Sequence, residues 1–195
     1  CIATNNSGFG LAGGPIRDSL ALNNIGEGLL GTSISLSNSL GNSAEGILST
    51  GTVVACRTRG NGRWGISSLD VVSLSTATLN GDGIMARGVL QSSAIRNVET
   101  GISADENTTD CLALENGGVG ITAGRLSGCD MVQNGRGAEL TDSAVAQRCR
   151  FSGNKGDGVT SGAILSSLVN FNQGPGVTRA KHVANSWVVG NGGAG

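Results

Sequence analysis

Five charged residues of alternating sign recur at nearly regular intervals along the chain: Asp70, Arg87, Asp105, Arg125 and Asp142. If the fold brings residues at this spacing into contact, these side chains form one row, with Glu106 and Asp110 close by. Carboxylates in such a row can hold a cation such as Ca²⁺ or take part in proton transfer. A surface ladder of ion pairs has the same pattern, and each pair contributes on the order of 0–1 kcal/mol. The ladder is the favoured interpretation, because alternating charges neutralise one another rather than bind a cation.

The five cysteines follow a related spacing: Cys1, Cys56, Cys111, Cys129 and Cys149. The last three follow one another at the same kind of interval as the charged row, so a repeat of that length places them one above another. Three interpretations are open: a thiolate metal site, a disulfide between neighbouring repeats, or a small buried apolar residue that can replace serine. Zinc motifs hold cysteines in local pairs, with two to four residues between them. The third interpretation is therefore favoured, and no metal site is predicted.

An asparagine repeat must position these side chains. Its asparagines recur about every eighteen or nineteen positions, which is the signature of a repeat architecture: Asn6, Asn24, Asn42, Asn61, Asn80, Asn97, Asn116, Asn134, Asn154, Asn172 and Asn191. Glycine follows four residues later in nine of them and three residues later after Asn80 and Asn134. Asparagine and glycine tolerate φ > 0, so each asparagine is expected at a turn. The nine with the longer spacing are predicted to stack as a ladder of amide hydrogen bonds: Asn6, Asn24, Asn42, Asn61, Asn97, Asn116, Asn154, Asn172 and Asn191.

A second column supports this phase. The residue five positions before each asparagine is always Ser or Cys, and all five cysteines lie in this column. The residue three positions before each asparagine is uncharged and small or apolar. Two such columns, two residues apart, describe the inward face of a β-strand. Cys1 falls in the first column, so it is interpreted as an inward residue of a coil rather than as a lipid-anchor cysteine.

The composition excludes several classes of protein. The chain has 34 glycines among 195 residues, 14% charged residues and a net charge of −1. Glycine at this density disfavours helical repeats. The near-zero charge gives no reason to expect a nucleic-acid partner, and no apolar run is long enough to predict a membrane span. A glycine-rich chain with 38% hydrophobic residues is better suited to short strands separated by turns.

These features predict an all-β solenoid of 10 to 11 coils, each with about three short strands and a length of about eighteen or nineteen positions. The motif N-x-x-x-G-[ILV], preceded by [SC]-x-[apolar]-x-x-N, resembles the right-handed parallel β-helix repeat of the pectate-lyase-like superfamily. A left-handed β-helix is the alternative, but its hexapeptide spacing is missing and parallel crossovers favour the right hand. Residues 1–195 are expected to form one β-helix domain, interpreted as a segment of a longer solenoid without caps of its own.

The expected function is structural or adhesive, as a spacer, fibre segment or surface module that can associate through its open ends. An extracellular or cell-surface location is expected, with carbohydrate as a candidate partner. The alternative is a polysaccharide lyase or epimerase acting on uronate polymers. The resemblance implies that such an enzyme would use the row from Asp70 to Asp142, with carboxylates holding Ca²⁺ and an arginine as base. No cofactor is predicted otherwise. The intervals between successive repeat asparagines are nearly equal along the whole chain, so no insertion is expected to form the walls of a cleft.

Two other features bear on binding, and neither favours it, because the threonine array is short and the tryptophans are far apart. Thr122, Thr160 and Thr178 share one position of the repeat, and a longer array of this kind is typical of ice-binding solenoids. Trp64 and Trp187 lie on distant coils, so no aromatic platform for a sugar is predicted.

Overall fold

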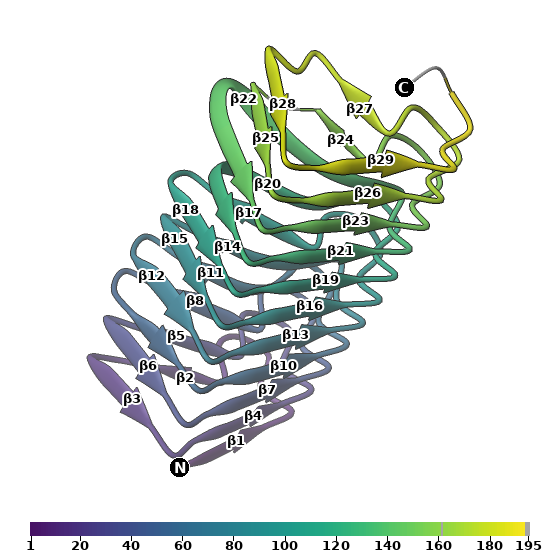
Figure 1. Cartoon of the computed structure of the whole chain (residues 1–195). Helices are drawn as coiled ribbons and strands as arrows, with labels where there is room; N and C mark the ends of the chain where they lie inside the picture. The colour runs from purple at the N-terminus through teal and green to yellow at the C-terminus, as the bar shows by residue number, and fades with distance from the viewer. Residues whose placement is uncertain (161, 194–195) are drawn as a thin grey trace.

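The computed structural model describes residues 1–160 and 162–193, which form a parallel β-solenoid without helices (Figure 1). Each of ten coils has three β-faces, formed by three strands in eight coils and by two strands in the other two, and a last strand begins the eleventh coil. Every strand pairs in parallel with its counterpart in the next coil. The predicted all-β parallel solenoid is therefore confirmed.

The first face is a sheet of eleven strands that crosses the front of Figure 1. Its strands are three residues long: β1 (Ile2–Thr4), β4 (Leu20–Leu22), β7 (Asn38–Leu40), β10 (Arg57–Arg59), β13 (Thr76–Thr78), β16 (Ser93–Ile95), β19 (Leu112–Leu114), β21 (Asp130–Val132), β23 (Arg150–Ser152), β26 (Leu168–Asn170) and β29 (Trp187–Val189).

Two further faces complete each coil, and long strands join them into one 18-stranded sheet. The second face contains β2 (Leu11–Ala12), β5 (Leu29–Gly31), β8 (Ile47–Ser49), β11 (Trp64–Ser68), β14 (Asp82–Ala86), β17 (Ile102–Ala104), β24 (Val159–Thr160) and β27 (Val177–Thr178). The third contains β3 (Pro15–Arg17), β6 (Ser33–Ser35), β9 (Val53–Val54), β12 (Val71–Ser73), β15 (Gly88–Leu90), β18 (Asn107–Thr109), β25 (Ala163–Leu165) and β28 (His182–Ala184). Two long strands run through both faces: β20 (Val119–Ser127) and β22 (Arg136–Gln147).

The core is a stack of small side chains from the first face against larger aliphatic ones from the other two. Ala77 and Ala94 of the first face are fully buried, as are Ile84 and Ile102 of the second face. Where Met131 and Phe151 bring larger side chains into the alanine column, the neighbouring strand β22 contributes the small Ala138 and Ala146 instead. A packed interior tolerates such exchanges when the total volume is kept.

Two corners of every coil have a residue in the left-handed conformation, one on each side of the first face. One corner precedes each ladder asparagine and the other precedes each Ser or Cys of the second column, as at Glu115 (φ 55°) and Asp110 (φ 52°). None of the ladder asparagines themselves has a positive φ. The prediction that asparagine occupies the φ > 0 position was therefore wrong by one residue, and the residue before it makes the turn.

The asparagine ladder is confirmed, and it is longer than predicted. Nδ2 of each asparagine donates to Oδ1 of the asparagine in the next coil in all ten steps from Asn6 to Asn191. The omitted Asn80 and Asn134 are rungs too, although their amide donations are the longest, at 3.2 and 3.3 Å. The tighter turn to their glycines therefore stretches the ladder without interrupting it.

Each ladder oxygen from Asn24 to Asn191 also accepts a backbone N–H. The N–H of Asn97, for example, donates to Oδ1 of Asn116 at 3.0 Å. The chain changes direction at the corner, so a side chain supplies the acceptor that the next coil's carbonyl provides within a strand. A buried backbone N–H must be paired, and asparagine meets that need in the interior.

The Ser/Cys column does the same at the other corner. The N–H of Ser19 donates to the Ser37 hydroxyl at 3.1 Å, and that hydroxyl donates to the Ser35 carbonyl at 2.7 Å. Cysteine can play the same role as acceptor: the N–H of Ser92 donates to the sulfur of Cys111 at 3.5 Å. The interpretation by size alone was thus incomplete, since the column also requires an atom that accepts one hydrogen bond and donates another.

We expect Asn116→Ala to lower the free energy of unfolding by about 2–4 kcal/mol, because buried Asn97 loses the acceptor of both its backbone and side-chain N–H groups. Exposed Asn38 is the control, and its change to alanine should stay within about 0.5 kcal/mol. Urea unfolding followed by circular dichroism measures both. Equal losses in the two variants would contradict the assigned role of the ladder.

Candidate functional site

The structure divides the predicted charge row into separate groups. Arg87 lies beside Asp70 and forms an ion pair of 2.6 Å between the guanidinium and the carboxylate. Arg125 does not stack on Asp105, because β20 pairs it with Asn107 of β18 and with Val145 of β22. A continuous ladder from Asp70 to Asp142 is therefore absent among the described residues.

Asp105 and Asp142 instead line one cavity of about 410 Å³, which we call the β22 cleft. Glu139, Thr122 and Arg179 lie on the same cavity. Its wall arises where the register between β20 and β22 shifts: Ala123 faces Leu140, but Arg125 faces Val145. The extra residues of β22 project outward, and three of them, 141 to 143, are exposed. Coil lengths alone did not indicate this bulge, which places exposed residues at the edge of the cavity.

The cleft combines three carboxylates with one arginine and hydroxyl groups. The Glu139 carboxylate also forms an ion pair with the Arg136 guanidinium, with 3.4 Å between Oε2 and Nη2. Carboxylates and hydroxyls at one cavity can accept hydrogen bonds from a polyhydroxyl ligand, and a carboxylate there could accept a proton. Glu139 stands in register between Thr122 and Thr160, so the three threonines do not form an unbroken array.

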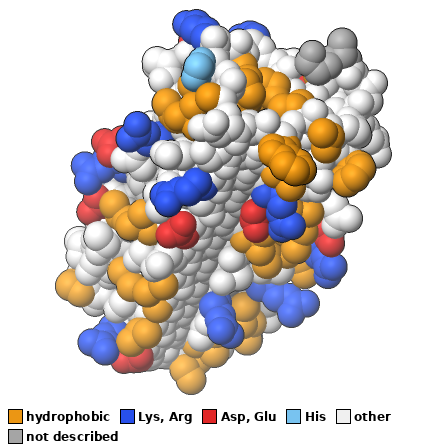
Figure 2. Space-filling view, in the orientation of Figure 1, with side chains coloured by type: hydrophobic (Ala, Val, Ile, Leu, Met, Phe, Trp, Pro, Cys, Tyr) orange, Lys and Arg blue, Asp and Glu red, His pale blue; other side chains and the backbone are white. Residues whose placement is uncertain are grey.

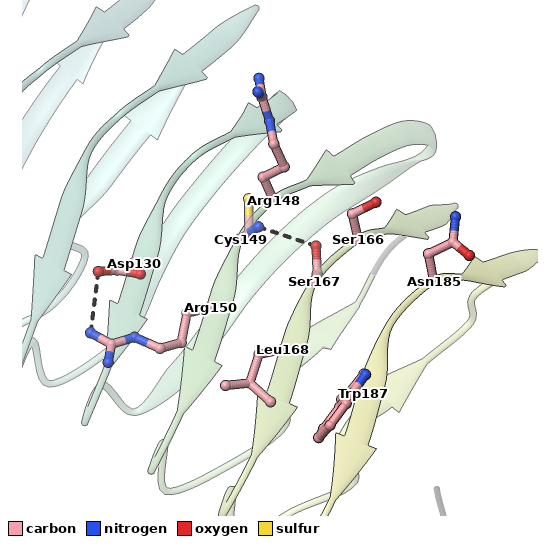
Figure 3. A pocket seen from close by; sticks show the side chains of 9 residues that line it. All are labelled: Asp130, Arg148, Cys149, Arg150, Ser166, Ser167, Leu168, Asn185 and Trp187. Atoms are coloured by element: carbon pink, nitrogen blue, oxygen red, sulfur yellow. Dashed lines mark hydrogen bonds and ion pairs between the residues drawn. The ribbon is translucent and has the colours of Figure 1, made fainter.

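A second hollow follows the left-handed corner that precedes the first face, and we call it the corner groove. It consists of two cavities of about 520 and 450 Å³ that share Asp130. Figure 3 shows the second cavity, where the outward side chains of Arg150, Leu168 and Trp187 lie side by side on consecutive strands. Its other rim consists of corner residues: Arg148, Ser166 and Asn185.

Apolar and polar groups meet in this groove. Trp187 is 73% exposed, and Arg150 donates to Asp130 at 3.2 Å. Figure 2 shows apolar side chains along the length of the molecule, including the C-terminal coils, with cationic side chains nearby. Sequence spacing could not reveal this groove, because it depends on which residues at the corners point outward.

All five cysteines are free thiols. Cys56, Cys111, Cys129 and Cys149 are buried in the Ser/Cys column. Cys1 is in register for that column, since Ile2 pairs with Leu20, but it is exposed because a neighbouring coil covers only one side of it.

The buried thiols perturb one another. The side-chain hydrogen bond to Cys129, followed by burial, raises the pKa of Cys111 and likewise that of Cys149. The two flanking thiols can donate to Cys129 and lower its pKa. Cys56 has no cysteine neighbour, and burial alone raises the pKa of its thiol.

Within residues 1–160 and 162–193, no group of three or more His, Cys, Asp or Glu side chains converges to hold a metal ion. No helix in this part of the chain is long and apolar enough to cross a membrane.

Comparisons with known proteins give little beyond the fold. No family model matches the sequence, and no curated protein matches it. One solved structure is similar: the A-module of the mannuronan C-5 epimerase AlgE6 from Azotobacter vinelandii. The match covers 100% of this chain and 81% of that chain, with 15% identity and a TM-score of 0.47. Similarity at this level carries no argument about activity.

The raised pKa of Cys56 predicts a loss of stability in alkali. An unfolded thiol ionises at about 8.5, so above that pH the unfolded chain binds fewer protons than the folded one. The thiol's contribution to the free energy of unfolding is complete below about pH 8.5. It declines as the pH rises towards the folded pKa, by at most about 1.4 kcal/mol per pH unit.

Urea midpoints measured between pH 7 and 10.5 should therefore fall more steeply for the native chain than for Cys56→Ser. The exposed thiol of Cys1 supplies the control, and Cys1→Ser should leave the slope unchanged. Parallel slopes for the native chain and Cys56→Ser would contradict the assignment.

Proposed function

We propose that this chain is a rigid, non-enzymatic solenoid that acts as a structural or adhesive module at the cell surface or outside the cell. The observation that carries this proposal is the pair of hydrogen-bonded columns, because the asparagine column joins each coil to the next at one corner and Ser or Cys side chains join most coils at the other. The asparagine column runs through ten steps without a gap. Coils stacked at about 4.8 Å make a rod of roughly 50 Å. A rod tied internally at every coil resists bending and suits a spacer or fibre segment.

The corner groove supports the adhesive part of the proposal. A sugar ring packs on an exposed aromatic face while hydroxyls bind nearby charged and amide groups. Trp187 offers the aromatic face, and Arg148, Asp130 and Asn185 offer donors and acceptors beside it. The proposed ligand is an extended polysaccharide lying along the groove, parallel to the long axis of the rod.

Self-association through the ends is also part of this proposal. A hollow of about 330 Å³ at the last coils is lined by Val177, Val183 and Val188, and these apolar side chains are the surface that a second copy would cover.

For the adhesive role, we expect the chain to bind members of a panel of acidic and neutral polysaccharides. Trp187→Ala should weaken that binding roughly tenfold, about 1.4 kcal/mol. Leu69 is as exposed as Trp187 (72%) and lies outside the groove, so Leu69→Ala should bind normally. Isothermal titration calorimetry measures both. Equal affinity in the two variants would contradict binding in the groove.

The β22 cleft favours a second candidate, an enzyme acting on uronate polymers. The cavity brings Asp105, Asp142 and Arg179 to one place, with a wall that can hold a chain against them. Ca²⁺ belongs only to this candidate. Among the described residues, no three acidic side chains converge to form a Ca²⁺ site.

For this candidate, polymannuronate and polygalacturonate would be incubated with the chain, with and without Ca²⁺. Lyase action gives an unsaturated product that absorbs in the ultraviolet, and epimerisation is visible by NMR. Asp105→Asn should reduce turnover by about 100-fold or more. Asp70→Asn removes a carboxylate that is paired outside the cleft and should leave turnover unchanged. Absence of turnover by the native chain would exclude this candidate for these polymers.

A further inference from the structure

The buried thiols of Cys111, Cys129 and Cys149 stack in a single column through three consecutive coils, and we call this column the thiol file. Leu112 pairs in register with Asp130, and Asp130 pairs with Arg150. Cys111, Cys129 and Cys149 immediately precede these residues, so each lies directly above the last. Cys129 is therefore flanked by Cys111 in the coil before it and by Cys149 in the coil after it. The local cysteine pairs of zinc motifs have no counterpart here, and only the stacking of coils brings these sulfurs together.

The spacing of the file suits one kind of metal coordination. Neighbouring strands lie about 4.8 Å apart. Two metal–thiolate bonds of the length known for zinc, about 2.3 Å, would span about 4.6 Å in a straight line. A disulfide fits less well, because it needs Cβ atoms about 3.8 Å apart. A file also differs from a tetrahedral site, since its sulfurs do not converge on one point. Linear binding between two sulfurs therefore requires little movement of the coils.

Backbone N–H groups lie beside the sulfurs. The backbone N–H of Ser92 donates to the sulfur of Cys111 at 3.5 Å. The strand register places the N–H groups of Cys111 and Cys129 beside the cysteines of the next coil in the same way. Hydrogen bonds of this kind stabilise a negative sulfur.

A buried polar group also lies beside the file. The thiol of Cys129 donates to the carbonyl of Thr108 at 3.4 Å. The hydroxyl of Thr108 is one of two buried side-chain polar atoms without a partner among the described residues. Buried polar atoms are normally paired, so this unpaired hydroxyl is an exception, on the residue whose carbonyl receives the Cys129 thiol.

The corner groove gives access to both ends of the file. Cys111 lines its first cavity and Cys149 its second, and each is 3% exposed. Cys129 is fully enclosed between them. Arg148 and Arg150 line the second cavity and can balance negative charge. An ion can therefore enter beside an outer thiol and be held against the central one.

We infer that Cys129 and one neighbouring thiol, Cys111 or Cys149, bind a soft monovalent metal ion, Cu(I), in linear two-coordinate geometry. Thiolates are the ligands that select Cu(I). Two thiols lose their protons as two copper–sulfur bonds form: 2 Cys–SH + Cu⁺ gives [Cu(S–Cys)₂]⁻ + 2 H⁺, with no change in oxidation state. The thiol hydrogen bonds to the carbonyls of Thr109, Ser127 and Gln147 are the ones available to be given up.

The test uses the whole chain carrying Cys1→Ser, because the exposed Cys1 thiol would bind copper by itself. Cu(I) is supplied without oxygen from its complex with bicinchoninate, and the copper retained per folded chain is measured by native mass spectrometry. Serine occupies the same column position in six other coils, so cysteine-to-serine variants should fold, which circular dichroism checks.

We expect one copper ion per chain, with two sulfur ligands by X-ray absorption. Cys129→Ser removes both possible pairs and should lower the affinity at least about 100-fold. Cys111→Ser and Cys149→Ser each leave one pair and should retain copper. Cys56→Ser, which changes an isolated buried thiol, should bind normally. The proposal is overturned if Cys129→Ser retains copper as well as Cys111→Ser does, or if Zn(II) is held as tightly as Cu(I).

Discussion

The structure depends on how the chain pairs its backbone N–H groups at two left-handed corners in every coil. Within a strand, the next coil supplies a carbonyl. After a left-handed residue the direction of the chain changes, and the N–H that follows needs a side-chain acceptor. Asparagine supplies it at one corner, and serine or cysteine at the other. A buried N–H without a partner costs about 1–3 kcal/mol, so this need recurs with every coil.

The same requirement links the ladders to the packing. The strand between the two corners has only three residues, and its single central side chain points inward, as the burial of Ala21 between partly exposed Leu20 and Leu22 shows. Small side chains at that position let the opposing isoleucines reach the centre. The interior is thereby organised as columns, and a cysteine in a column has the residues of the neighbouring coils as its nearest partners.

The candidate cleft lies where the repeat is least regular. The β22 bulge breaks the register of two faces and hollows a cleft beside Asp105, whereas the regular coils beneath it pair Asp70 with Arg87 in an ion pair. In the corner groove, the corner residues face outward and differ from coil to coil. Their side chains determine which polar and apolar groups the groove presents to a ligand. The thiol file is different, since it uses the regular stacking itself to bring identical side chains together.

The sequence by itself determined the coil, because the phase of Asn, Gly and the Ser/Cys column repeats with every turn and stacking makes equal positions neighbours. It could not determine which residue takes φ > 0, since the asparagine and the residue before it satisfy the same local pattern. Nor could it place Arg125 against Asn107 rather than Asp105, because a bulge of a few residues shifts register without changing composition. Only the tertiary structure decided the β22 cleft, the exposure of Cys1 and the shape of the corner groove. Each depends on which side of a turn faces solvent and on what the adjacent coil covers.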